Sequence, residues 1–270
     1  MKHLLKQFPI TTRFALAIFL MVAALALNIV VDGPWLKANF PYLPVLLLLL
    51  VTWFLFRLDN KNLKALGMNI SLGNVFYMLF GLLLGAIGFL AANYAKSLYT
   101  GESIVLSSSI DIWGIMASLY FILPTVAVEE MLFRGYLFKK TIEVSNVIVA
   151  NIIFSVLFML IHVLDGDVLQ SPGMIVMLAI SIPIGHLLFA TALLRSRTLI
   201  FPIGIHLGNN WATRHLISSQ EDGNSILVVL ERTTFDTWPS FIGMLLLYNG
   251  VFVLAIFLIW KLTRSVRSDK

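Results

Sequence analysis

The stretch AVEEMLFRGYL, residues 127–137, places two adjacent glutamates and an arginine at the end of an almost wholly apolar run. Residues 112–128 contain no charged side chain. Ionisable groups inside an apolar segment are costly, and they often pair with one another or mark a functional site. The stretch therefore indicates a membrane helix that carries either an ion pair, a site, or both.

The composition excludes most soluble protein classes. Of the 270 residues, 59% are hydrophobic and only 12% are charged, whereas a soluble domain is about one quarter charged. The chain has no cysteine, so disulfides and thiolate metal sites are excluded. The net charge of +5 comes from basic residues between apolar runs, which favours a role in membrane orientation over a nucleic-acid partner.

The apolar segments predict the fold class. A hydrocarbon core about 30 Å thick requires roughly 20 apolar residues in helix. We therefore expect an all-α, polytopic membrane protein with about eight transmembrane helices, in a single integral-membrane domain over residues 1–270. The first segment is too long for the apolar region of a signal peptide, so we expect it to be retained. The segments are 14–31, 42–58, 75–95, 112–133, 146–164, 174–194, 198–217 and 241–260.

The charges of the connections predict the orientation. Every second flank is basic, which places both termini in the cytoplasm by the positive-inside rule. We expect an integral protein of a prokaryotic inner membrane, with the lipid bilayer as its surroundings. The basic flanks contain Lys2, Lys6, Arg13, Arg57, Lys61, Lys64, Lys139, Lys140, Arg195, Arg197, Lys261, Arg264, Arg267 and Lys270. The other connections contain Asp32, Glu102, Asp165, Asp167, Glu221 and Asp222.

The third segment contains GLLLGAIG, residues 81–88. Small residues at four-residue spacing allow two helix backbones to approach closely. We expect this motif to serve helix packing.

The two glutamates of the opening stretch differ in their expected partners. Glu130 and Arg134 are four residues apart and share a helix face, with the acid N-terminal to the base, which is the favourable order. Glu129 projects about 100° away from Glu130. A carboxylate that is left free in this way suits a general base. The pair alone would serve equally well as an anchor at the membrane interface.

Two further stretches bear polar groups at helical spacing. In SVLFMLIH (155–162), Phe158 and His162 share a face, and in IGIHLGNNW (203–211), His206 and Asn210 do so. A histidine and an amide on one helical turn could donate two hydrogen bonds to one developing oxyanion. We expect His186 to be an interhelical hydrogen-bonding residue without a catalytic role. Asn209 is expected to cap or pack.

Together these stretches resemble a known family. EEMLFR fits an EExxxR pattern, FMLIH fits FxxxH, and HLGNN fits HxxxN, in this order on successive predicted helices. The chain thereby resembles the CPBP (CAAX protease and bacteriocin-processing, or Abi) family of intramembrane proteases, which includes the CAAX prenyl endopeptidases. The resemblance covers about residues 112–215, the expected catalytic core.

The resemblance implies an intramembrane endopeptidase that acts on a membrane-anchored protein or peptide, with a prenylated CAAX-type substrate as one option. It implies that Glu129 and His162 activate a water and that His206 and Asn210 stabilise the oxyanion. Glu130, Arg134 and Phe158 would support the site. No cofactor is expected to be required.

Zinc is the alternative to a metal-free site. A helical HExxH motif is absent from the sequence. Three protein ligands and a water form the usual catalytic zinc site, so Glu129, His162 and His206 would be the ligands if a metal were bound.

Two other function classes stay open at this stage. A non-catalytic membrane scaffold or bacteriocin-immunity protein would use the same fold without proteolysis. A proton-coupled transporter could also use glutamates and histidines as a relay, although the sequence shows no inverted repeat.

The straight-helix geometry conflicts with the implied site. Glu129 falls near the cytoplasmic end of its segment, whereas His162 lies about 24 Å along the next one, counted from Asn146. With straight spanning helices these two side chains would not meet. Pro124 could kink the first of these helices, and residues 133–144 could lie along the membrane or re-enter it.

Overall fold

The computed structural model describes residues 9–31, 33–219, 223–230 and 233–262, and each of the eight expected segments overlaps a helix in it. These helices are α2 (Pro9–Val31), α4 (Leu43–Leu58), α5 (Leu72–Thr100), α6 (Ile112–Arg134), α8 (Val147–Val163), α10 (Pro172–Ser196), α11 (Ile200–Trp211) and α12 (Trp238–Leu262). Shorter helical pieces connect them: α3 (Pro34–Asn39), η1 (Leu63–Leu66), α7 (Tyr136–Val144), α9 (Gly166–Leu169) and the π-helical turn η2 (Ala212–Leu216).

The helices make the chain an integral, polytopic membrane protein. Five stretches of helix are long and apolar enough to cross a membrane, namely those that comprise α2, α5, α6 with α7, α10 and α12. Two further apolar helices, α4 and α8, are shorter than a full span. The count of eight spans and the cytoplasmic placement of the termini therefore stay predictions. Several of the basic and acidic flanking residues lie outside the described ranges: Lys2, Lys6, Asp32, Glu221, Asp222, Arg264, Arg267 and Lys270.

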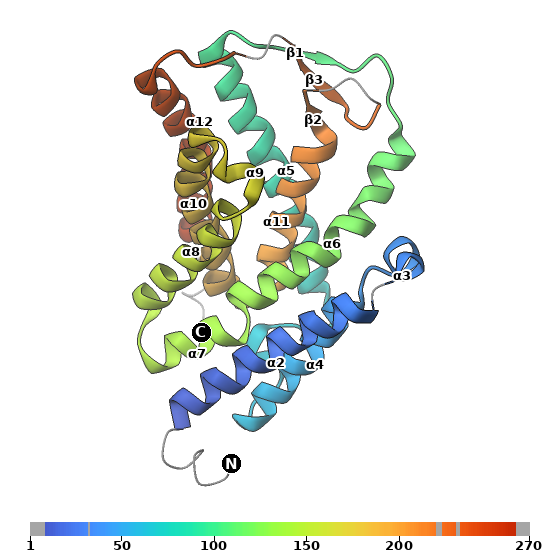
Figure 1. Ribbon diagram of the computed structural model, residues 1–270, viewed down its shortest axis with the longest axis vertical. Helices are drawn as coiled ribbons and strands as arrows, with labels where there is room; N and C mark the ends of the chain where they lie inside the picture. Colours follow the sequence, from blue (N-terminus) through green and yellow to red (C-terminus); the bar gives the residue numbers. More distant parts are fainter. Residues whose placement is uncertain (1–8, 32, 220–222, 231–232, 263–270) are drawn as a thin grey trace.

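A small sheet was not anticipated by the all-α assignment. The strands β1 (Ser103–Leu106), β3 (Leu227–Leu230) and β2 (Ile217–Ser218) are ordered β1-β3-β2. β1 and β3 are antiparallel, whereas β2 and β3 are parallel. The expected helix 198–217 is wrong at its end, because helix α11 stops at Trp211 and the chain passes through η2 into β2. We call the end of the bundle that carries this sheet the sheet end (Figure 1).

Helix α11 lies inside the bundle, in contact with α5, α6 and α10. Its approach to α5 depends on glycines of both helices. A Cβ added at Gly85 would lie 1.9 Å from the carbonyl oxygen of Ile205, and one at Gly208 would lie 2.0 Å from that of Leu82. The prediction that the 81–88 motif serves packing is confirmed for Gly81 and Gly85, where any Cβ would overlap the α11 backbone.

The α5–α11 contact gives a stability test. We expect Gly85→Ala to lower the thermal unfolding temperature of the purified protein, because the added methyl group forces two helix backbones apart; overpacking typically costs about 1–3 kcal/mol. Gly88→Ala is the matched control, since its nearest neighbour would be a ring carbon of Phe252 at 3.9 Å. Equal unfolding temperatures for the two variants would contradict this account of the contact.

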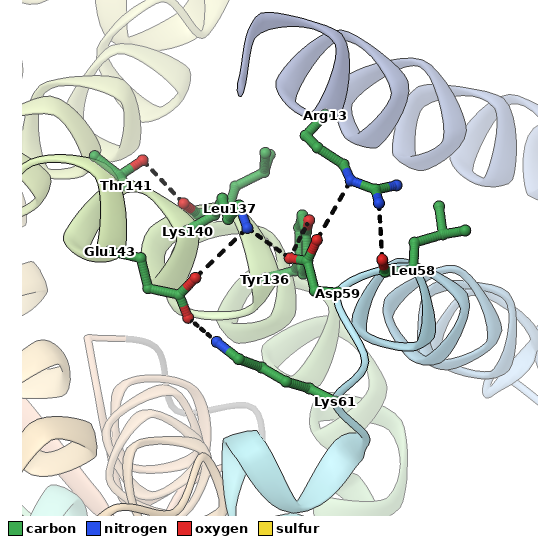
Figure 2. Close-up of polar contacts among 9 residues, drawn as sticks. All are labelled: Arg13, Leu58, Asp59, Lys61, Tyr136, Leu137, Lys140, Thr141 and Glu143. Carbon is green, nitrogen blue, oxygen red and sulfur yellow. Dashed lines mark hydrogen bonds and ion pairs between the residues drawn. The ribbon is translucent and has the colours of Figure 1, made fainter. Parts of the chain in front are cut away.

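The opposite end of the bundle is held by a network of charged side chains, drawn in Figure 2. Asp59, just after α4, accepts hydrogen bonds from Lys140 Nζ at 2.7 Å and from the Tyr136 hydroxyl at 2.9 Å. Arg13 of α2 pairs with the same carboxylate at 3.3 Å. Three segments far apart in the sequence thus meet at Asp59. We call this end the basic end, and α7 lies there (Figure 1).

The network also includes Glu143, which pairs with Lys61 and with Lys140. Lys139 donates a hydrogen bond to the carbonyl oxygen of Ala65 at 2.6 Å. Helix α7 is amphipathic in consequence: it buries Tyr136, Phe138 and Thr141, while its lysines and Glu143 bond to the connection after α4. Its position on α6, α8, α4 and α2 closes the basic end of the bundle.

The pKa of Asp59 follows from this network. Partial burial alone would raise it, but the hydrogen bonds from Lys140 and Tyr136, with the charges of Lys140 and Arg13, lower the pKa below its ordinary value of 3.8. A carboxyl group with a lowered pKa in the folded state adds stability above the pKa of the unfolded chain and loses it as the pH falls through the folded pKa.

We therefore expect Asp59→Asn to lower the unfolding temperature at neutral pH and to have little effect below the folded pKa of Asp59. Wild type and variant should converge as the pH falls through the lowered folded pKa of Asp59, because the wild-type carboxylate then becomes protonated. Thermal unfolding in detergent across this pH range measures the effect. A difference that stays constant with pH would contradict the electrostatic role of Asp59.

Candidate active site

The end of α6 is set by a glycine. A Cβ at Gly135 would lie 2.0 Å from the carbonyl oxygen of Met131, so only glycine fits where the chain turns from α6 into α7. The last turns of α6 therefore project into the bundle with Glu129, Glu130 and Arg134. Glu130 and Arg134 are completely buried, in an interior that is otherwise largely apolar.

The expected pair of Glu130 and Arg134 forms. Arg134 Nη1 lies 3.2 Å from Glu130 Oε1, and the same oxygen lies 2.8 Å from Nδ1 of His206 on α11. An ionised carboxylate only accepts hydrogen bonds, so Nδ1 of His206 carries a hydrogen here. Nε2 of His206 consequently faces away from Glu130. The Glu130 carboxylate, held by Arg134, thus determines that Nδ1 of His206 carries the hydrogen, and it sets the orientation of the imidazole ring.

The Arg134 guanidinium also packs against aromatic rings. Its central carbon lies 4.2 Å from the ring centre of Phe158 on α8 and 5.1 Å from that of Phe189 on α10. Phe189 stacks on the ring of His206 with centroids 4.6 Å apart. Cation–π contacts of this kind strengthen when they are desolvated. Arg134 thereby joins helices α6, α8 and α10 around one charge, next to the histidine of α11.

Glu129 differs from Glu130 as its helix face predicts. Its carboxylate is 23% exposed and lies 3.7 Å from His206 Nε2, which is longer than a hydrogen bond. Its Oε2 atom is buried and has no hydrogen-bond partner among the described residues. The Glu129 carboxylate is therefore uncommitted and lines a cavity.

His162 reaches the same cavity from α8. Its Nδ1 is 2.8 Å from the carbonyl oxygen of Phe158, so Nδ1 donates and Nε2 is left free. The expected packing of Phe158 against His162 also forms, edge to face with centroids 4.7 Å apart. The aromatic contact of Arg134 with Phe158 places the last turn of α6 beside the residues that precede His162.

Straight helices that run parallel to one another would keep Glu129 and His162 apart, but the helices of the structure are not arranged in this way (Figure 1). Helix α6, which contains Pro124, instead crosses the bundle obliquely, whereas α10 and α11 follow its long axis (Figure 1). The short helix α8 ends at Val163, one residue after His162. Both side chains consequently line one cavity.

The cavity has a volume of about 410 Å³ and contains each side chain that the resemblance assigned to catalysis. Asn210 lines it one helical turn beyond His206, as their spacing predicts, and Asn209 lines it too instead of only packing. The polar part of the wall comprises Glu129, His162, Ser181, His206, Asn209, Asn210, Thr213, Arg214, Tyr248 and Asn249.

Several polar residues of this wall were missed by the sequence analysis, and two of them interrupt the apolar spans of α10 and α12. Ser181 of α10 and Asn249 of α12 line the cavity, and both Ser181 Oγ and Asn249 Oδ1 are buried without a hydrogen-bond partner among the described residues. Each interrupts an apolar span, and that interruption was the available signal. Only the packing of α10 and α12 together assigns the two residues to the same cavity.

The expected interhelical hydrogen bond of His186 does not form among the described residues. The residue is fully buried, but neither ring nitrogen has a hydrogen-bond partner in the part of the chain that the structure describes. It packs edge-on against Phe138 of α7, with ring centres 5.9 Å apart.

The alternative of a zinc site receives no geometric support. No three histidine, aspartate or glutamate side chains within the described residues group closely enough to hold a metal ion, and Glu129, His162 and His206 are all among them. The donor set therefore does not fit a three-ligand site in this conformation.

Comparison with known families agrees with this geometry. The family model for type II CAAX prenyl endopeptidase Rce1-like proteins matches residues 111–212. Over this region, which is less than half of the chain, the protein is similar to the Rce1-like family. The family implies a protease of the CAAX type in a membrane context, with a peptide or protein substrate. Searches of curated proteins and of solved structures found no match.

The Rce1-like region begins at Asp111, the N-cap of α6, and ends at Ala212, where α11 gives way to η2. It includes α6, α7, α8, α9, α10 and α11. Glu129, His162, His206 and Asn210 all fall inside it. Six further cavity residues lie outside it, on α5, η2 and α12, so elements beyond the family region complete the cavity wall: Phe89, Thr213, Arg214, Tyr248, Asn249 and Phe252.

The two adjacent glutamates should differ sharply in their effect on stability. We expect Glu130→Gln to lower the free energy of unfolding by about 3–5 kcal/mol, because it leaves the buried Arg134 charge unpaired. Glu129→Gln is the matched control and should change it by less than about 1 kcal/mol, since Glu129 makes no ion pair at hydrogen-bond distance. Denaturation of both variants in the same detergent compares them. Equal destabilisation would contradict the asymmetry of the pair.

Proposed function

We propose that this protein is an intramembrane endopeptidase that hydrolyses a peptide bond of a membrane-tethered substrate, with prenylated CAAX-type peptides as the first class to test. The observation that carries the proposal is the convergence of an uncommitted carboxylate, Glu129, with His162, His206 and Asn210 on one cavity. The Rce1-like family of residues 111–212 supports the same reaction class.

In the proposed mechanism, Glu129 is the general base. A water held between Glu129 and the free Nε2 of His162 attacks the scissile carbonyl carbon, and one of its protons passes to the Glu129 carboxylate. When the tetrahedral intermediate collapses, the carbon–nitrogen bond breaks and Glu129 returns this proton to the leaving amine. A base serves this step when it lies within hydrogen-bond reach of the water it activates.

His206 and Asn210 would stabilise the oxyanion. Both face the cavity from α11, so the side-chain amide and the imidazole can donate to one oxygen. Donation by His206 Nε2 requires the doubly protonated ring, since Nδ1 already donates to Glu130. That ring would then carry its positive charge between the two carboxylates of Glu129 and Glu130.

Glu130, Arg134 and Phe158 would act as positioning residues. Glu130 holds the ring of His206 by a hydrogen bond, and Arg134 holds Glu130. Phe158 supports both the Arg134 guanidinium and the His162 ring. Glu130 and Arg134 are completely buried and do not line the cavity, so they orient the reacting groups without touching the substrate, whereas Phe158 also lines the cavity.

The rest of the cavity suits an apolar peptide. Met177, Leu178, Ile182 and Phe252 supply an apolar wall. The unpartnered Ser181 Oγ and Asn249 Oδ1 can accept hydrogen bonds from the N–H groups of an extended peptide. A mostly apolar pocket with a few placed polar groups is typical of sites that bind part of a substrate out of water.

The catalytic test uses detergent-purified protein and a fluorogenic farnesylated CAAX peptide. We expect the wild type to cleave it, while Glu129→Gln and His162→Ala each lose at least about 100-fold in kcat/KM, in line with the loss of general-base catalysis. Both variants should keep the wild-type unfolding profile. Retained cleavage in both variants would overturn the proposed roles.

The same assay separates the alternatives. Activity that a chelator leaves unchanged supports the metal-free mechanism, and activity that is lost and then restored by zinc would make Glu129, His162 and His206 ligands. A scaffold or immunity protein would keep its cellular function in the Glu129→Gln variant. A proton-coupled transporter would show pH-driven flux in vesicles that this variant lacks.

A further inference from the structure

The basic side chains of the protein are collected at one end of the bundle. Contacts tie this end together: Arg13 and Lys140 meet at Asp59, Lys139 bonds to Ala65, and Arg195 bonds to the carbonyl oxygen of Trp260 at 2.5 Å. The described lysines and arginines on the connections of the basic end are Arg13, Arg57, Lys61, Lys64, Lys139, Lys140, Arg195, Arg197 and Lys261.

The connections at the sheet end contain few basic residues and several acidic ones. Their described basic residues are Lys37, Lys96 and Arg214, and Lys96 is neutralised by Glu102 at 2.8 Å. Asp111, Asp165 and Asp236 lie on the same side. Cytoplasmic connections of membrane proteins carry an excess of lysine and arginine. This rule places the basic end in the cytoplasm and the sheet end on the opposite side of the membrane.

The active-site cavity does not reach the basic end. Below Glu129 and His206 lie Glu130 and Arg134, both completely buried. Further buried side chains of α6, α7 and α10 complete this floor: Met131, Tyr136, Phe138 and Leu193. A substrate or a water that arrives from the basic end would have to displace the ion pair and this packed layer.

The cavity extends instead toward the sheet end. It follows α11 from His206 to Thr213 and Arg214, eight residues on, which is about 12 Å along a helix. Thr213 and Arg214 belong to the π-helical turn η2, and β2 of the sheet begins at Ile217. Both are exposed, so they mark the opening. Figure 1 shows α11 running from the interior up to the sheet.

From these two observations we infer that the active-site cavity opens on the non-cytoplasmic face of the membrane. If the proposed function holds, on which this consequence rests, the substrate is a peptide segment presented at that face, as in an exported protein or one anchored in the outer leaflet. A prenylated protein on the cytoplasmic side would face the closed floor.

The absence of cysteine makes a direct test available. Arg214→Cys introduces one thiol at the opening, and Lys64→Cys introduces one at the basic end, at an exposed position. Spheroplasts that express each variant are treated with a membrane-impermeant maleimide. We expect Arg214→Cys to be labelled in intact spheroplasts and Lys64→Cys only after the membrane is permeabilised. Labelling in detergent gives the full signal for each.

A second pair of cysteine variants tests whether the labelling pattern reflects the orientation of the protein and not a local effect of one substitution. Asp167→Cys on α9 should behave like Arg214→Cys, and Arg57→Cys at the end of α4 should behave like Lys64→Cys. The reverse pattern would overturn the inference and would return the opening to the cytoplasm. Equal labelling of both ends in intact spheroplasts would also overturn it, because it would mean that the protein has no single orientation.

The labelling result is independent of catalysis, so it separates this inference from the proposed function. In a second arm, spheroplasts with the wild type or with Glu129→Gln receive a membrane-impermeant fluorogenic peptide with an apolar anchor. Cleavage by the wild type alone would support both conclusions. External labelling of Arg214→Cys without cleavage by purified wild type would leave the orientation standing and would reject the peptidase.

Discussion

The buried ion pair of Glu130 and Arg134 is the interaction on which the site depends. Both side chains are withdrawn completely from solvent, which is tolerable only because they neutralise each other and because aromatic rings contact the guanidinium. The pair also reaches beyond its own helix, since Glu130 bonds His206 of α11. One interaction thereby fixes the relative position of two helices and the orientation of a functional imidazole.

The division of labour between adjacent glutamates follows from helix geometry. Consecutive residues point about 100° apart, so two neighbouring carboxylates on α6 meet different surroundings. Glu130 faces Arg134 and the interior, whereas Glu129 faces the cavity and keeps an oxygen without a partner. Glu130, which is held in an ion pair, thus lies beside Glu129, which is free to react, on the same helix.

The glycine contact between α5 and α11 supports this arrangement from behind. Gly85 and Gly208 allow the two helix backbones to touch, which brings α11 into the interior and lets His206 reach α6. At the other end of the bundle, Asp59 binds α2 and α7 through charged partners. The interior is therefore organised by close packing and one ion pair, and the basic end by exposed and half-buried salt bridges.

Local sequence patterns were enough to predict most of the helices, the Glu130–Arg134 pair, the contact of Phe158 with His162, and the family resemblance over about residues 112–215. These follow from local periodicity and from motif spacing, which need no knowledge of tertiary contacts. Only the tertiary structure decided that Glu129 and His162 share a cavity, that Ser181 and Asn249 complete its wall, and that α11 ends in a π turn beside a small sheet. The physical reason is the oblique path of α6 and the short length of α8: depth within a bundle depends on tilt and packing, and residue spacing along one helix does not encode either.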